Sequence, residues 1–337
     1  MARKSLDRHT IKETILADID NETFSIELIA QAFLITKKTV HQILDELLAD
    51  TIIKREKKGR YALVERTTLF TYENKGLDEH TVYMTDVKPL LSELSQNAHR
   101  TFAYIFTEMF NNAIDHSQSD RIEVTVLQNA CRVTCSIRDN GIGIFENIRQ
   151  KLNLADKKYA ILELAKGKLT TDKTKHSGEG IFFASKAGDA FYIFSDDLTF
   201  ASVDTEKSYL FSNEKNTAGT EVVFSVKKDS KIVLREVMQR YSEDPELINF
   251  NKTIVPVSLL GYGEKDAFFV SRSQAKRLST RFEKFENVVL DFDGVAEIGQ
   301  AFADELFRVF QNEHPRLQLT YINCVPDVAN MIGRIKR

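Results

Sequence analysis

An amphipathic segment around residue 108 constrains the fold of this chain more than any other feature. Its apolar residues recur at positions that form one continuous face of an α-helix: Phe102, Ile105, Phe106, Met109, Phe110 and Ala113. The opposite face is polar, because Glu108, Asn112 and Asp115 fall within about 60° of one another at about 100° per residue. Asn and Asp are poor residues for a helix interior. The segment predicts a helix anchored in a core, with a polar face that is either solvated surface or a functional site.

A buried carboxylate is predicted at the end of the following strand. In the strand expected over residues 131–139, four alternate apolar residues share one side with Asp139, because alternate residues of a strand point the same way. A carboxylate on that side needs a polar partner. The turn Asn140-Gly141-Ile142-Gly143 follows directly, and its glycines allow the backbone to approach a ligand closely.

The segment HSGEGIFFASKAGD, residues 176–189, has the pattern of a helix start. Ser177 is a suitable N-cap, and Gly178 and Gly180 keep the first turn open. Exposed N–H groups at such a helix start bind phosphate. The preceding lysine-rich stretch lacks a steady apolar period, which predicts a long loop of the kind that serves as a functional lid or is disordered. Further on, Gly219-Thr220 opens another strand.

Four short motifs in this order carry a family resemblance: Glu108-x-x-x-Asn112, Asp139-x-Gly141-x-Gly143, Gly178-Glu179-Gly180 and Gly219-Thr220. They resemble the N, G1, G2 and G3 boxes of the GHKL ATPase superfamily, which includes gyrase, MutL, the heat-shock chaperone and histidine kinases. The resemblance implies a Bergerat α/β sandwich over residues 67–228 that binds ATP with Mg²⁺.

The resemblance also implies roles for single residues. Asp139 would accept the adenine amino hydrogen with Thr220 nearby, and Gly141 and Gly143 would let the base lie against the backbone. Asn112, together with Glu108, would hold Mg²⁺ through hard oxygen ligands. Glu108 would also orient and deprotonate the attacking water or hydroxyl. The other predicted nucleotide contacts are Asp115, Lys168, His176, Ser177, Gly178, Glu179, Gly180 and Ile181.

Glu108 narrows the choice within the superfamily. Histidine kinases commonly carry Asn at this position, and residues 67–97 are too short for their dimerisation hairpin with its phospho-acceptor histidine. A carboxylate instead matches members that hydrolyse ATP or phosphorylate a hydroxyl, including anti-sigma serine kinases. Both reactions remain open from the sequence.

Residues 1–66 show three helical patterns followed by a basic hairpin, an order that resembles a winged helix-turn-helix domain. The third helix would enter the major groove and the hairpin would contact phosphates. Acidic and basic residues nearly balance in this segment, so protein docking is the alternative. The residues expected to contact DNA are Lys37, Lys38, Thr39, Gln42, Lys57, Lys58 and Arg60.

Residues 251–337 alternate strand and helix, which predicts a small α/β fold, and residues 229–250 look like a helical connector. Within this segment, residues 287–310 resemble the central strand, loop and helix of STAS domains, the fold of anti-sigma antagonists. Those antagonists carry Asp-Ser at the helix start, whereas this chain has Gly299-Gln300. The resemblance therefore implies a domain that binds a protein partner or a second copy and accepts no phosphate.

Composition sets the outer limits. A chain of 337 residues exceeds one core of usual size, and we expect an α+β and α/β multidomain protein. A net charge of -3 creates no global pull toward nucleic acid or membrane, and the absence of an apolar span predicts a cytoplasmic location. The leading hypothesis is a bacterial DNA-binding regulator that hydrolyses ATP slowly. Its rivals are a serine/threonine kinase acting on another chain and a nucleotide-binding scaffold without turnover.

Overall fold

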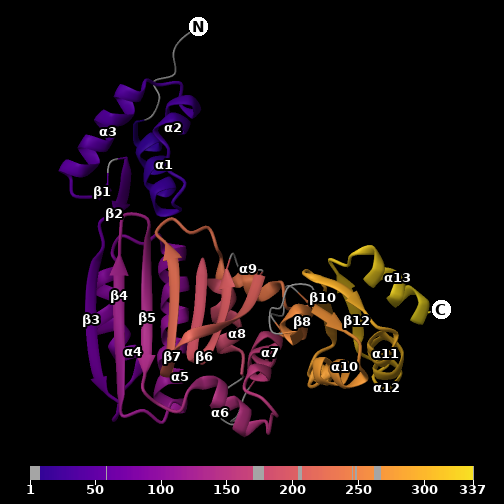
Figure 1. Cartoon of the computed structure of the whole chain (residues 1–337). Coiled ribbons are helices and arrows are strands. Elements are labelled where there is room, and N and C mark those ends of the chain that lie inside the picture. The colour runs from indigo at the N-terminus through magenta and orange to yellow at the C-terminus, as the bar shows by residue number, and fades with distance from the viewer. Residues whose placement is uncertain are drawn as a thin grey trace.

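The computed structural model describes residues 8–57, 59–169, 178–203, 207–244, 246, 249–261 and 267–336. Three units follow one another along the chain, with the middle unit between the other two (Figure 1). Helices and several separate sheets together confirm the expected mixed α+β multidomain class. None of the described helices has the length and apolar character that crossing a bilayer demands.

The N-terminal unit is three helices and an antiparallel hairpin with a core of their own. Two helices begin at hydroxyl caps, since Ser25 accepts from Leu28 N and Thr36 from Thr39 N. The expected order of helices and hairpin is confirmed. The elements are α1 (Arg8–Asp20), α2 (Ile26–Ala32), α3 (Lys37–Ala49), β1 (Ile53–Lys57) and β2 (Arg60–Leu63).

This unit stands on one end of the central sheet (Figure 1). Polar and apolar contacts join the N-terminal unit to the central unit. Arg132 Nε donates to Asp20 Oδ2 at 2.7 Å, and Ala130 and Cys131 pack against the N-terminal core. Asp20 and Arg132 side chains are only 10% and 26% exposed. The contact is therefore a partly desolvated ion pair at the turn between the second and third strands of the sheet.

The central sheet has five antiparallel strands in the order β3-β4-β5-β7-β6. Burial alternates from residue to residue along β5. This pattern indicates that one face of the sheet is buried, and helices cover that face. Residues 190–203 form a single strand with an irregular pairing at Asp196. The strands are β3 (Arg66–Glu73), β4 (Arg121–Gln128), β5 (Arg132–Asp139), β6 (Ala190–Val203) and β7 (Lys207–Lys227).

Helices cover the inner face of this sheet and lie behind it in Figure 1. The predicted apolar stripe of α5 is buried in full, from Phe102 to Ala113. The helices are α4 (Glu79–Val82), continued by a π-helical turn (Tyr83–Val87) and a 3-10 turn (Lys88–Leu91), then α5 (Gln96–His116), α6 (Ile144–Lys151), α7 (Lys158–Lys166) and α8 (Gly180–Ala187).

Helix α7 corrects one expectation. The lysine-rich stretch before residue 178 was predicted as a loop because it shows no amphipathic period, yet residues 158–166 form a helix. Seven consecutive residues from Ala160 to Lys166 are buried. Its charged residues Glu163 and Lys166 are buried as an ion pair, so charged residues that suggest an exposed loop in the sequence are covered in the fold. Its second cover is the C-terminal unit, which lies across α7 from the central sheet (Figure 1).

The C-terminal unit is a small α/β fold, as expected, built on a parallel sheet of order β12-β10-β8 and a parallel pair β11-β9. Its strands are β8 (Lys252–Pro256), β9 (Ala267–Phe269), β10 (Asn287–Asp291), β11 (Val295–Ile298) and β12 (Gln318–Ile322). Its helices are α10 (Arg272–Ser279), α11 (Gln300–Asp304), α12 (Gln311–Glu313) and α13 (Pro326–Ile335), with 3-10 turns at Val257–Gly261 and Phe282–Lys284 and a π-helical turn at Glu305–Phe310; α9 (Leu234–Gln239) lies in the connector.

The hydrophobic cores divide the chain differently from its three units. One continuous cluster of buried side chains runs from the central sheet through α7 and α8 into the C-terminal unit, whereas the N-terminal unit keeps a separate cluster. The central and C-terminal units therefore share a core, and the N-terminal unit is joined by a smaller contact.

Candidate functional site

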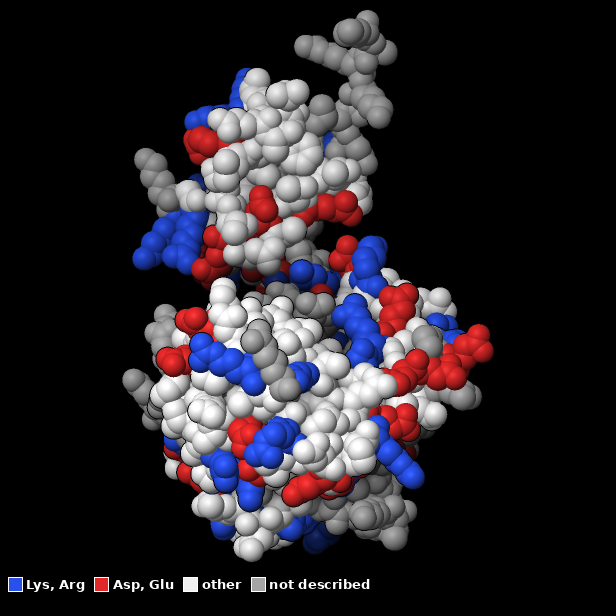
Figure 2. Space-filling view, turned by 90° about the vertical axis from the view of Figure 1, so that its right-hand side faces the viewer, with Lys and Arg blue, Asp and Glu red and all other residues white. Residues whose placement is uncertain are grey.

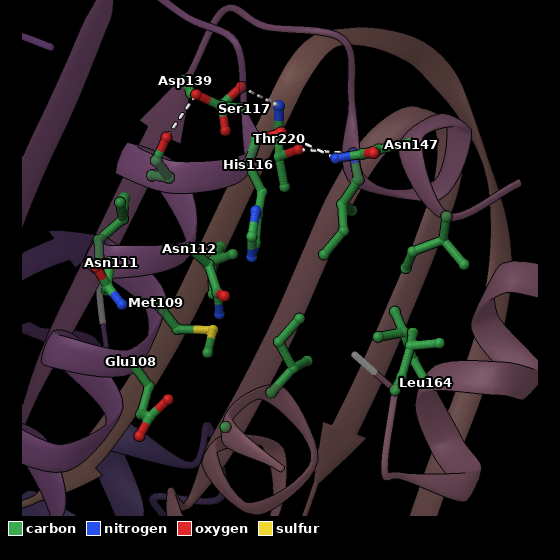
Figure 3. A pocket seen from close by; sticks show the side chains of 18 of the residues that line it. Glu108, Met109, Asn111, Asn112, His116, Ser117, Asp139, Asn147, Leu164 and Thr220 are labelled. Atoms are coloured by element: carbon green, nitrogen blue, oxygen red, sulfur yellow. Dashed lines mark hydrogen bonds between the residues drawn. The ribbon is translucent and has the colours of Figure 1, made fainter. Parts of the chain in front are cut away.

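A cavity of about 300 Å³ lies between α5, the end of β5, the C-terminal half of β7, and helices α6, α7 and α8. Figure 3 shows its side chains along the polar face of α5, with Asp139 and Glu108 at opposite ends. Among the residues predicted as a site, those that line it are Glu108, Asn112, Asp139, Gly143, Gly178, Gly180, Ile181 and Thr220. Segments more than 100 residues apart in the sequence thus meet at one hollow.

Asp139 is fixed in place at one end of the cavity. Its Oδ1 accepts from Gly141 N at 2.9 Å and from Thr220 N at 3.2 Å, and Thr220 Oγ1 in turn accepts from Ile144 N at 2.9 Å. The side chain is 6% exposed. Burial raises the pKa of Asp139 above its usual range, and the two N–H donors oppose that shift.

The turn after Asp139 requires glycine because the chain passes close to the end of α5. A Cβ on Gly141 would lie 1.8 Å from Ser117 O, the same oxygen that accepts from Ile142 N at 3.0 Å. Gly143 has φ +83, in the left-handed region, and a Cβ there would lie 2.6 Å from Ser195 Oγ. Gly143 lines the cavity, whereas Gly141 lies against the end of α5 and does not line it.

The other end of the cavity joins α5 to the start of α8. Glu108 and Asn112 project from the same face of α5 (Figure 3). Gly180 is the first residue of α8, and a Cβ on it would lie 2.0 Å from Glu108 Oε2. The carboxylate therefore lies directly against the first turn of a helix, where N–H groups have no intrahelical partner.

Several predicted residues lie elsewhere. Asp115 is exposed on α5 and does not line the cavity. Lys168 Nζ donates to Lys284 O of the C-terminal unit at 2.9 Å. Glu179 stands at the N-cap position of α8, so the helix begins later than a cap at Ser177 would place it. His176 and Ser177 fall outside the described residues.

The sequence reasoning missed residues of α6 and α7. Asn147 and Lys151, one helical turn apart, line the cavity together with Leu164 and Leu169. Asn147 Nδ2 donates to His116 O at 2.9 Å, which ties α6 to the end of α5. A buried Asn between Phe145 and Ile148, just after the glycine turn, was a readable signal. Leu164 and Leu169 gave no such signal, since a leucine that lines a cavity cannot be told from a core leucine in the sequence.

The N-terminal residues predicted to contact DNA occupy two places on the surface. Lys37, Lys38, Thr39 and Gln42 lie in the first two turns of α3, where Lys37 is paired with Glu27 and Thr39 is half-buried. Lys57 and Arg60 are exposed on the hairpin, and Lys58 lies outside the described residues. On the face seen in Figure 2, the Lys and Arg of this unit gather at one edge.

Comparison with known proteins agrees with the site. No curated protein matches the chain. Residues 274–329 match the family model described as a STAS-like domain of unknown function. Residues 97–230, which hold every cavity residue of α5, β5, α8 and β7, match the model described as histidine kinase-, DNA gyrase B- and HSP90-like ATPase. The chain therefore carries an ATP-binding domain of the GHKL type followed by a STAS-like domain.

Proposed function

We propose that this protein is a slowly ATP-hydrolysing regulator that couples its nucleotide state to DNA binding and to a protein contact of its STAS-like domain. The observation that carries the proposal is a cavity with a fixed carboxylate acceptor at one end and a carboxylate–amide pair beside an open helix start at the other.

Asp139 would recognise the base. Both backbone donors bind its Oδ1, which turns the other oxygen into the acceptor for the exocyclic amino hydrogen of adenine. A buried charged acceptor discriminates strongly, because a ligand without that donor leaves it unpaired. Gly143, which lines the cavity, would supply bare backbone against which a flat ring can lie, and Gly141 would let the turn pass close to the end of α5.

The donors at the other end fit a phosphate-bound magnesium ion. Among the described residues no group of three or more His, Cys, Asp and Glu side chains could hold a metal by itself. Mg²⁺ is suited to such a place, since it commonly takes one or two protein oxygens and completes its shell with phosphates and water. We assign Asn112 and Glu108 as those oxygens; bound Mg²⁺ would neutralise charge on the phosphates.

Glu108 would act as general base. Its position against Gly180 puts a carboxylate next to the helix start at which phosphate would be held. From there Glu108 can orient a water molecule and accept its proton as the γ-phosphate is attacked. The N–H groups at Gly178, Gly180 and Ile181, which line the cavity, would bind the phosphate oxygens.

The two outer units would carry the output. The hairpin of residues 53–63 exposes Lys57 and Arg60, which suits contact with DNA phosphates. In the STAS-like domain the helix α11 starts at Gly299-Gln300 without a hydroxyl. The serine of the Asp-Ser pair corresponds to Gln300, whose amide side chain has no hydroxyl to accept a phosphoryl group. We therefore assign this domain a binding role.

A serine/threonine kinase acting on a separate chain is the second candidate, because Glu108 could deprotonate a hydroxyl as well as water. ATP labelled in its γ-phosphate separates the possibilities. We expect free phosphate from the purified protein alone. Label that appears only on an added partner protein would support the kinase, and tight binding with neither product would support a scaffold without turnover.

A further inference from the structure

Arg281 follows α10 in the C-terminal unit. Its guanidinium forms hydrogen bonds with residues at the end of α7. Its Nη1 donates to Glu163 Oε2 at 2.7 Å, and its Nη2 donates to Gly167 O at 3.0 Å and to Lys168 O at 2.5 Å. The side chain is 10% exposed. Arg281 itself has φ 67, a left-handed conformation that is unfavourable for a residue with a side chain and is held by its surroundings.

The C-terminal unit also supplies the rest of the cap of this helix. The last carbonyls of a helix have no partner within it, and here Lys166 O accepts from Thr253 Oγ1 at 2.8 Å while Gly167 O and Lys168 O accept from Arg281. In the opposite direction, Lys166 Nζ donates to Thr280 O at 2.9 Å. The two units therefore terminate each other's helices.

The buried charges of Glu163 and Lys166 stay paired with each other if Arg281 is removed. Glu163 Oε1 accepts from Lys166 Nζ at 2.6 Å, so the buried carboxylate keeps one cation. Lys166 is fully buried and Glu163 is 3% exposed. Removal of Arg281 would thus free the carbonyl of Gly167 and leave Lys168 O with only Lys284 Nζ as donor, at 3.4 Å. It would not leave a buried charge alone.

The residues that Arg281 binds are sequence neighbours of residues that line the nucleotide cavity. Leu164 on α7 and Leu169, directly after Lys168, line the cavity. Leu169 N donates to Gly178 O at 3.0 Å, and Gly178 also lines the cavity. A second route is aromatic: cavity residue Phe182 stacks on Phe250 at 4.7 Å, and Phe250 meets Phe285 of the C-terminal unit at 5.4 Å.

We propose that Arg281 is a positioning residue of the nucleotide site, through which the STAS-like domain sets the wall formed by Leu164, Leu169 and Gly178. The inference rests on nucleotide binding in the cavity, as proposed above. On this proposal the C-terminal domain helps to shape the nucleotide-binding site. A partner protein that shifts this domain would then change the affinity for nucleotide, and bound nucleotide would change the affinity for the partner by the same factor.

The test compares four full-length proteins: the parent, Arg281→Ala, Arg281→Lys and Arg308→Ala. The last is the matched control, because Arg308 forms an exposed ion pair with Asp304 in the same domain. Calorimetry with Mg²⁺ and a non-hydrolysable ATP analogue gives Kd, and thermal unfolding gives stability. We expect Arg281→Ala to raise Kd about tenfold, within the usual range for coupled sites, and Arg308→Ala to leave it unchanged.

Arg281→Lys separates positioning from stability. Lysine keeps the charge beside Glu163 but lacks the fork that spans a carboxylate and two carbonyls, so we expect nearly parental unfolding with a raised Kd. Arg281 variants that lower only the unfolding temperature, with Kd within about twofold of the parent, would overturn the inference. If Arg281→Ala does not fold, Arg281→Lys decides by the same criterion. A parent protein that binds no nucleotide would instead refute the proposed function itself.

Discussion

The carboxylate of Glu108 lies against Gly180: a methyl group on Gly180 would come within 2.0 Å of Glu108 Oε2. One residue belongs to the middle of α5 and the other begins α8. The absence of a side chain at position 180 is therefore what allows the carboxylate to face the start of α8. This contact makes the geometry of Glu108 sensitive to a change that adds only one carbon atom.

Gly180→Ala should reduce ATP hydrolysis by about a hundredfold, the scale on which a displacement of about 1 Å in an active site acts. Stability should change little, since alanine favours helix. Gly333→Ala in α13 is the matched control, because a Cβ there meets no atom within 4 Å; it should stabilise the fold by about 0.5–1 kcal/mol and leave hydrolysis unchanged. Parental turnover in Gly180→Ala would argue against Glu108 as the base.

Glu108→Gln keeps a side-chain oxygen that can still contact Mg²⁺, so it should bind nucleotide nearly as the parent does. It should lose turnover by about 10²- to 10⁴-fold, the usual contribution of a general base. Phosphate release measures turnover, and calorimetry measures binding. Glu123→Gln, which removes a carboxylate paired with Arg121 on β4, is the control and should retain full activity. Equal hydrolysis by the parent and Glu108→Gln would remove the base from the mechanism.

Asp139→Asn should weaken ATP binding about ten- to a hundredfold, because a hydrogen bond to a charged acceptor is replaced by one to an amide. The exposed residue Asp120 provides the control, and Asp120→Asn should bind normally. A comparison of ATP with GTP in both proteins tests base recognition directly. Asparagine at 139 with parental affinity for ATP would show that this carboxylate is not the adenine acceptor.

Nucleotide binding should weaken as pH falls, and earlier than for an ordinary aspartate. Burial raises the pKa of Asp139, and the protonated form cannot serve as a charged acceptor. The same shift affects folding with the opposite sign: the stability that Asp139 contributes is present below its unfolded pKa of about 3.9 and is lost as pH rises through the raised folded value. Asp139→Asn should abolish both dependences, which calorimetry and unfolding across pH would reveal.

DNA binding should depend on salt through the hairpin. With Lys57 and Lys58 both changed to Ala, the slope of log K against log salt should fall by about 2, since each phosphate contact contributes about 0.9. A double change of Lys75 and Lys88 to Ala, at exposed positions of the central unit, is the control. An identical slope in the hairpin variant would leave protein docking as the role of the N-terminal unit.

The sequence predicted the positions of those functional residues that follow from the period of a single helix or strand. The stripe of α5 placed Glu108 and Asn112 correctly, and strand parity placed Asp139 on the buried side, because each depends on a period within one element. Helix α7 was missed because its buried ion pair of Glu163 and Lys166 looks like exposed polar sequence and is covered by packing against the STAS-like domain. Leu164, Leu169 and Arg281 could not be assigned for the same reason: their positions follow from packing between domains that local periodicity does not encode.

Strand β5 begins at Arg132, which holds the N-terminal unit, and ends at Asp139 at the cavity. Seven steps of about 3.3 Å separate the two, roughly 23 Å along a stiff element of a central sheet. Asp139 therefore marks the end of β5 that is far from the N-terminal unit. Any effect of bound nucleotide on the N-terminal unit has to cross this length, and β5 is an element that contacts both.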